Sequence, residues 1–238
     1  MSSGQFLEIN IEKFKSLQNK VIEMDLEQVY LPVSHQLEFS FNNEWVAKVL
    51  LPWNMYFDES GQVFKKEDYH LALVMIRAGI AATGYIHNGA LIDHKVFRAY
   101  MVRQKQGKSQ IKYLKTKGKS RAGSRVRLGE SEMFFEEINE RLSSYATNYP
   151  IDFWGISCSK TLWPYFFGSR TPPPFDKKQA NLLSIPFHIQ HPDFETLQLI
   201  HKKIESFHLL LSDKGKSMLG SFGDTNNSFE GNQEDENW

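Results

Sequence analysis

Hydrophobic and polar positions alternate with two different periods along the first part of the chain. Apolar residues recur every three or four positions between about Gly4 and Met24, a spacing that predicts one or two amphipathic helices. From Val29 to Trp53 the period shortens to two, and residues 37–41 alternate apolar and polar side chains as a half-buried strand does. Residues 45–51 are more continuously apolar and predict either the hairpin partner of this strand or a short helix. Residues 57–68 are a polar connection.

Three strands of a central sheet are predicted next, one directly after another. Residues 71–76 are an uninterrupted apolar run, which indicates a strand buried on both faces. A turn at Ala78-Gly79 separates it from a second strand at 80–86, and the turn sequence Asn88-Gly89 leads into a third strand at 90–96. A strongly basic stretch follows this meander in the sequence.

The second half of the chain predicts helices and strands in alternation. The segments, in order, are an amphipathic helix at 131–146, a buried strand at 153–158, a short helix at 159–167, a short strand at 182–187 and a final helix from Pro192 whose apolar stripe reaches Leu211. The first of these helices has two candidate caps, Ser124 and Ser131, so its start is open. Strands alternating with helices predict an α/β or α+β fold, with a mixed central β-sheet flanked by helices.

Composition divides the chain into three parts. Residues 1–69 are predicted to be a helical and strand extension packed on the core, and residues 70–212 the main domain. Residues 213–238 are rich in Gly, Ser, Asn and acidic groups, so they predict a disordered acidic tail. The sequence shows no long apolar run and no secretory signal, and Cys158 is the only cysteine, which excludes internal disulfides. These features favour a reducing, cytoplasmic compartment without membrane association.

Charge is distributed unevenly, although the formal net charge is zero. Residues 95–127 hold twelve of the chain's 28 basic residues and no acidic residue. The middle of this stretch is poor in large apolar side chains, so residues 103–125 are predicted to form a solvated loop that attracts a polyanion. Tyr100 and Tyr113 lie among the charges and can stack on unpaired bases. The stretch favours nucleic-acid binding over its alternatives, a solvated linker or a localisation signal. The predicted RNA-binding residues are Lys105, Lys108, Lys112, Lys115, Lys117, Lys119, Arg121, Arg125 and Arg127.

One short motif inside this stretch, Gly107-Lys108-Ser109-Gln110, has the residue types of a reactive loop. A glycine lets the backbone approach a ligand closely, and the neighbouring lysines can hold phosphates. The Gln110 amide cannot act as a general base at neutral pH, but it can orient a water molecule or stabilise an oxyanion. The alternative is an ordinary glutamine in a solvated loop, and the motif alone leaves both open.

The remaining candidates for chemistry are weak. His188 and His191 have a metal-like spacing without an obvious third ligand, so an ordinary pair of histidines is expected. Asp93-His94 could orient a residue of the basic stretch or simply occupy a surface turn. Cys158 lies in an apolar strand and is expected to be an inert core thiol. No metal site and no cofactor is predicted.

The order of segments from Leu71 to Leu210 resembles the catalytic domain of the Vms-like release factors. The most specific piece is RQKQGKSQ at residues 103–110, followed by AGS at residues 122–124. The strand pair before this piece, and the segments WPYFFG, LLSIPF and HPDFETLQLIHKKIESFH after it, continue the resemblance. The zinc-finger and ankyrin segments of the eukaryotic members have no counterpart, so the chain resembles a stripped-down member of bacterial type.

This resemblance implies a fold like the middle domain of the eukaryotic class I release factors, and action on peptidyl-tRNA in ribosome-associated quality control. The glutamine that is most tied to activity in the family corresponds to Gln110, and the basic residue before it corresponds to Arg103. The loop around this glutamine corresponds to the segment that contains Gly107 and Ser109. The implied reaction frees a stalled nascent chain, by hydrolysing the ester or by cutting the tRNA near its 3′ CCA end. The implied partners are peptidyl-tRNA and the ribosome or its large subunit. A monomer that needs no metal ion is expected.

Two other functions stay open at this point. The same basic stretch would serve a non-catalytic module that binds tRNA or ribosomal RNA, since phosphate contacts alone give affinity. A metal-dependent nuclease is the weaker alternative, because the sequence offers no ligand set for its metal ion.

Overall fold

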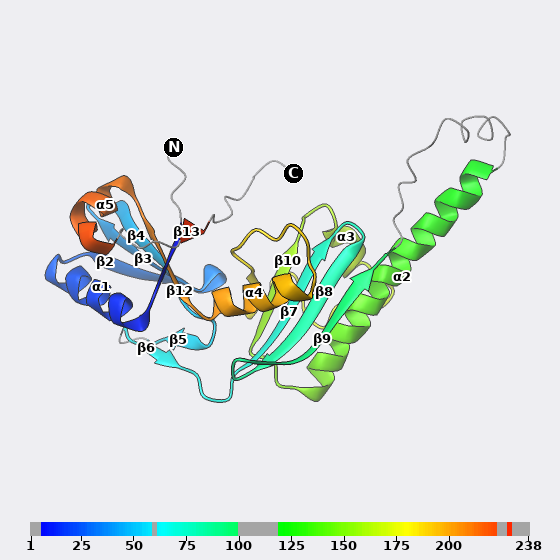
Figure 1. Ribbon diagram of the computed structural model, residues 1–238, viewed down its shortest axis with the longest axis horizontal. Coiled ribbons are helices and arrows are strands. Elements are labelled where there is room, and N and C mark those ends of the chain that lie inside the picture. The colour runs from blue at the N-terminus through cyan, green and yellow to red at the C-terminus, as the bar shows by residue number, and fades with distance from the viewer. Residues whose placement is uncertain (1–5, 59–60, 100–118, 223–227, 230–238) are drawn as a thin grey trace.

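The computed structural model describes residues 6–58, 61–99, 119–222 and 228–229, and for residues 119–131, 221 and 228–229 it describes the backbone alone. Two larger β-sheets lie beside each other along the long axis of the molecule (Figure 1). A small hairpin of β5 (Met55–Phe57) and β6 (Val63–Lys65) lies where the chain passes from the first sheet to the second.

The first sheet is antiparallel and combines both ends of the described chain. Its strand order is β13-β1-β12-β4-β3-β2. The strands are β1 (Phe6–Ile9), β2 (Glu27–Leu31), β3 (Gln36–Phe41), β4 (Glu44–Leu50), β12 (Phe207–Leu211) and β13 (Ser228–Phe229), with the short 3-10 turn η1 (Pro32–Ser34) after β2. The helices α1 (Ile11–Glu23) and α5 (Asp213–Leu219) contribute Phe14, Leu17 and Leu219 to its core. β3 and β4 form the hairpin that was one of the two predictions for residues 45–51.

The second sheet is mixed and contains the predicted meander. Its strand order is β11-β10-β7-β8-β9. The strands are β7 (His70–Arg77), β8 (Ile80–His87), β9 (Ala90–Arg98), β10 (Phe153–Cys158) and β11 (Leu182–Ser184). β10 runs parallel to both β7 and β11, whereas β7, β8 and β9 are antiparallel. The predicted α+β class with a mixed sheet is confirmed.

β7 is buried on both faces, as its apolar run predicts, and its two faces belong to two different cores. On one face, Ala72, Val74 and Ile76 cluster with Ile138 and Leu142 of α2 (Lys119–Asn148). On the other face, Leu71, Leu73 and Met75 cluster with Leu197 and Ile200 of α4 (Phe194–Ile204). The short helix α3 (Trp163–Phe167) packs on α2. Within the described residues, no helix is at once long enough and apolar enough to cross a lipid bilayer.

Leu142→Ala is expected to lower the free energy of unfolding by about 2–5 kcal/mol, because the leucine side chain is fully buried between α2 and the sheet. Urea denaturation followed by circular dichroism measures the loss. Met133→Ala on the same helix is the matched control, since that side chain is 60% exposed and its removal should change stability by less than about 0.5 kcal/mol. Equal losses in the two variants would contradict the core position of Leu142.

Two boundaries differ from the sequence predictions because tertiary pairing overrides helical periodicity. Residues 6–9 form β1 rather than a helix, since their backbone pairs with β12. Asn10 then begins α1 by accepting a hydrogen bond from the Lys13 amide at 2.8 Å. Leu211 belongs to β12 and not to the last helix, because α4 ends at Ile204 and the chain turns back between β1 and β4.

Residues 213–222, which the composition assigns to the acidic tail, are folded instead as α5 and the turn that follows it. Ser212 caps α5 by accepting a hydrogen bond from the Gly215 amide at 2.9 Å. Leu219, together with Phe222 of the 3-10 turn η2 (Gly220–Phe222), is buried in the core of the first sheet. β12 and α5 thus belong with the N-terminal sheet, which corrects the predicted division of the chain at residue 212. Residues 223–227 and 230–238 lie outside the described residues.

Candidate functional site

Residues 100–118, the central part of the basic stretch and called the basic segment from here on, connect β9 to α2, which packs against the second sheet. β9 enters this segment through Ala99, whose amide donates to the Gly79 carbonyl at 3.0 Å beside the β7–β8 turn. The chain leaves it as α2, which extends well beyond the sheet (Figure 1). β7 and the parallel β10 end on the same side, at Arg77 and Cys158. We call this end of the sheet the carboxyl edge, and it is where mixed α/β sheets commonly bind ligands.

Most predicted site residues lie outside the described residues. These are the catalytic candidates Arg103, Gly107, Ser109 and Gln110, and the RNA-binding candidates Lys105, Lys108, Lys112, Lys115 and Lys117. The other four candidates, Lys119, Arg121, Arg125 and Arg127, lie in the first turns of α2. The loop predicted over residues 103–125 is therefore wrong for its last part. Lys, Arg, Ala and Leu are strong helix formers, and extending a helix that buried residues already stabilise is far easier than starting one.

Asp93 ties β9 to α2, the two elements that flank the basic segment. Its Oδ1 accepts hydrogen bonds from Arg141 Nη2 and, at 3.2 Å, from the Tyr145 hydroxyl. Burial raises the pKa of Tyr145, which keeps this hydroxyl a donor. The neighbouring His94 packs on Phe194, with ring centroids 4.3 Å apart. Asp93 therefore holds α2 on the sheet and does not occupy a surface turn.

Arg77 places a cation at the carboxyl edge. Its Nε donates to the Ile189 carbonyl at 2.7 Å, and its Nη1 donates to the Ile76 carbonyl at 3.0 Å and to Ser157 Oγ at 3.4 Å. Burial lowers the pKa of Arg77, but a guanidinium starts from so high a value that it stays charged. The sequence analysis missed this residue. A single basic residue at the end of an otherwise apolar strand is the feature that could have indicated it.

The remaining sequence candidates are Cys158, His188 and His191. Cys158 is partly buried, and this burial raises the pKa of its thiol to about 12, so the thiol stays protonated at neutral pH. His188 and His191 are exposed. In the described part of the chain they join no group of three metal-ligating side chains.

A hollow of ≈ 360 Å³ lies between α2 and α3, further along α2 from the basic segment. Tyr165 on its rim is 55% exposed, and its ring stacks at 6.2 Å on that of Phe135. Arg170 lies opposite, with its Nε 3.8 Å from a carboxylate oxygen of Glu136. The exposed Tyr165 ring can stack on an unpaired base, but Glu132 and Glu136 outnumber the single cation, so the hollow has no excess of positive charge.

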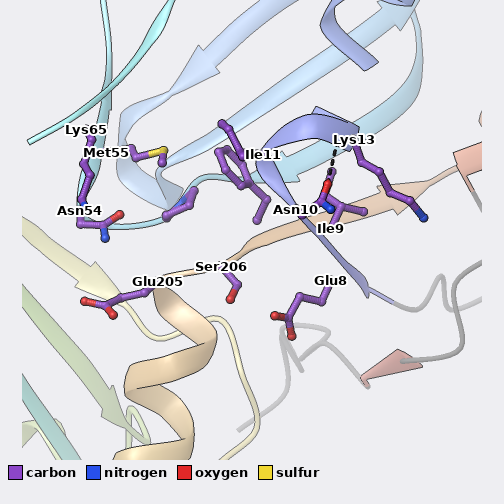
Figure 2. Close-up of a pocket in the computed structure, with 12 residues that line it drawn as sticks. Glu8, Ile9, Asn10, Ile11, Lys13, Asn54, Met55, Lys65, Glu205 and Ser206 are labelled. Atoms are coloured by element: carbon purple, nitrogen blue, oxygen red, sulfur yellow. Dashed lines mark hydrogen bonds between the residues drawn. The ribbon is translucent and has the colours of Figure 1, made fainter. Parts of the chain in front are cut away.

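A larger cavity of ≈ 710 Å³ lies elsewhere, between the first sheet and the end of α4 (Figure 2). Its lining carries carboxylates from Glu8 and Glu205 together with ammonium groups from Lys13 and Lys65. Since the charges of the two signs are balanced, this cavity lacks the excess of cations that a polyanion requires. It is not part of the candidate nucleic-acid site.

Residues 71–211, more than half of the chain, match the family described as Bacteroidetes VLRF1 release factor. The chain belongs to this release-factor family. The matched range runs from β7 to β12 and contains Arg103 and Gln110. The resemblance to Vms-like release factors from Leu71 to Leu210 is thereby confirmed.

Two further proteins are similar to this VLRF1 family member. The tRNA endonuclease ANKZF1 of Bos taurus is 24% identical over 141 residues, which are 58% of this chain and 19% of that protein. The chain thus covers a minor part of the length of this relative. A solved structure described as the Vms1 mitochondrial localization core is 10% identical, covers 86% of this chain and 90% of its own, and superimposes with a TM-score of 0.41.

Proposed function

We propose that this VLRF1 family member frees stalled nascent chains from peptidyl-tRNA on ribosomes or large ribosomal subunits. The observation that carries the proposal is the family match over residues 71–211, because this range includes the basic segment and its Gly-Lys-Ser-Gln motif. The bovine relative is named as a tRNA endonuclease, which supports tRNA as the substrate class. The charge on Arg77 at the carboxyl edge supports an anionic ligand there.

Binding of the tRNA depends on lysines of the basic stretch, residues 95–127. Lys105, Lys108, Lys112, Lys115 and Lys119 contact phosphates of the acceptor stem, and each contact releases counterions. Beyond this stretch, the exposed ring of Tyr165 on the α2–α3 hollow offers a stacking face to an unpaired nucleotide of the 3′ end. The acceptor end is thereby held between the basic segment and α3.

Catalysis depends on positioning, with Gln110 at the reacting centre. For ester hydrolysis, the Gln110 carbonyl accepts a hydrogen bond from the attacking water, and its amide N–H groups stabilise the oxyanion of the tetrahedral intermediate. For cleavage of the RNA backbone, Gln110 orients a ribose 2′-hydroxyl while Arg103 stabilises the charged phosphorane. Gly107 and Ser109 shape the loop that presents Gln110. Neither route uses a metal ion.

A doubly labelled peptidyl-tRNA tests the proposal and identifies the bond that is cleaved. Purified protein is incubated in EDTA with a substrate labelled on the peptide and on the tRNA 3′ end. Release of peptide with an intact CCA end identifies ester hydrolysis, and a shortened tRNA identifies endonucleolytic cleavage. If the protein retains the tRNA in a salt-sensitive way and frees no peptide, the proposal fails and a non-catalytic RNA-binding module is the better account.

A further inference from the structure

Three potential metal ligands meet at the end of the second sheet opposite to the carboxyl edge. His70 begins β7 and His87 ends β8, and the two residues are direct cross-strand partners. Their imidazole rings are stacked, with centroids 4.3 Å apart and planes inclined by 13°. Asp68 precedes β7, and its Oδ1 lies 2.8 Å from Nε2 of His87 and 3.2 Å from Nε2 of His70. Both ring nitrogens thus point at one carboxylate oxygen.

These separations are close to those of a tetrahedral metal centre. With bonds of about 2.0–2.1 Å to nitrogen and oxygen, the ligand atoms of a tetrahedral Zn²⁺ site lie about 3.3 Å apart. The three ligand atoms of this cluster lie within 4.8 Å of one another, and the Asn88 side-chain nitrogen, 3.2 Å from Nε2 of His87, has to give way for an ion to be enclosed. No second group of three such residues is found in the described part of the chain.

The surroundings hold the ligands in this arrangement. Nδ1 of His70 lies 2.7 Å from the hydroxyl of the buried Tyr85, and this hydrogen bond keeps Nε2 directed at Asp68. The Asn88 side chain accepts from the Tyr69 amide at 2.7 Å, and the Asn88 amide donates to the Tyr69 carbonyl at 2.9 Å. The segment that carries Asp68 is thereby fixed beside the end of β8.

Exposure and donor type decide which ion fits. The His70 side chain is 10% exposed, while those of His87 and Asp68 are 37% and 76% exposed, so the cluster is anchored on its inner side and open to water on its outer side. Two imidazole nitrogens and one carboxylate, with room for a water molecule, are a donor set that suits Zn²⁺ and not Mg²⁺ or Ca²⁺, which prefer oxygen ligands alone.

We propose that Asp68, His70 and His87 bind a Zn²⁺ ion with water as the fourth ligand. The ion would cross-link the segment before β7 to the end of β8. The site lies about 23 Å from the carboxyl edge, since seven residue steps of β7 span about 3.3 Å each. Its effect is therefore on the stability of the sheet, and the proposal is independent of the chemistry proposed for Gln110.

Zinc binding to the full chain tests this proposal. The protein is stripped with EDTA, exchanged into metal-free buffer and titrated with ZnCl₂ by calorimetry, and thermal unfolding is measured with and without the ion. One Zn²⁺ per chain and a raised melting temperature are expected. His87→Ala and Asp68→Ala should each weaken binding at least about 10-fold and abolish the rise in melting temperature.

The variants are chosen so that the result is decisive. His87 and Asp68 are partly or largely exposed, so their loss leaves the fold intact, which circular dichroism checks. His188→Ala removes an exposed histidine outside the cluster and should bind Zn²⁺ as the unchanged protein does. Substoichiometric binding by the unchanged protein, or equal affinity in His87→Ala, would overturn the proposal. Peptide release by His87→Ala should match that of the unchanged protein.

Discussion

Replacing Gln110 by alanine is expected to slow peptide release from peptidyl-tRNA about 100- to 1000-fold, the usual loss when one group that stabilises a transition-state oxyanion is removed. The affinity for tRNA should stay unchanged, because a neutral amide neutralises no phosphate. Single-turnover kinetics with protein in excess measures the chemical step, and filter binding at the same salt concentration measures the affinity.

Gln106→Ala is the matched control, since it makes the same change four residues away in the same basic segment. Its release rate should equal that of the unchanged protein. The catalytic assignment of Gln110 would be abandoned if both variants lost activity equally. It would also be abandoned if Gln110→Ala released peptide at the full rate.

Replacing five lysines of the basic stretch, residues 95–127, is expected to have the second large effect, this time on the affinity for tRNA. A protein with Lys105, Lys108, Lys112, Lys115 and Lys119 changed to alanine should show a shallower dependence of log affinity on log salt. If all five contact phosphates of the double-helical acceptor stem, the slope decreases by about 4.5, at about 0.9 for each contact with a duplex. Binding isotherms between about 50 and 200 mM salt measure the two slopes.

The control removes the same amount of charge from other surfaces. Its five substitutions are Lys15, Lys65, Lys177, Lys178 and Lys202 to alanine, all of exposed residues. This control protein should keep the slope and the affinity of the unchanged protein. If both five-fold variants lost affinity to the same extent, binding would follow net charge alone and the basic stretch would have no special part in it.

The sequence predicts those features that local pattern determines. The apolar run of β7 indicates a strand buried on both faces, and α2 and α4 do pack on opposite sides of it. The basic stretch stands out through composition alone, and the order of its motifs leads to the release-factor family. Helical periodicity misleads at Leu211, because this residue lies seven positions after Ile204 and so continues the apolar stripe of α4, although it belongs to β12.

Other features depend on contacts between segments that are distant in the sequence, and hydrophobic periodicity gives no information about such contacts. Arg77 finds its main partner at Ile189, and Asp93 finds Arg141, so both roles emerge only in the folded chain. The pairing of His70 with His87 could have been found, since the two residues lie equally far from the Ala78-Gly79 turn. A hairpin about that turn makes them neighbours, but the spacing alone resembles no metal motif.

The most direct test of the central claim is peptide release on isolated large ribosomal subunits that hold a labelled peptidyl-tRNA. The unchanged protein should free the peptide in a reaction that saturates with protein concentration, and Gln110→Ala should bind the same particles without freeing it at a comparable rate. Retention of the labelled peptide on the subunits by both proteins, with both bound, would contradict the claim that this VLRF1 family member is a release enzyme.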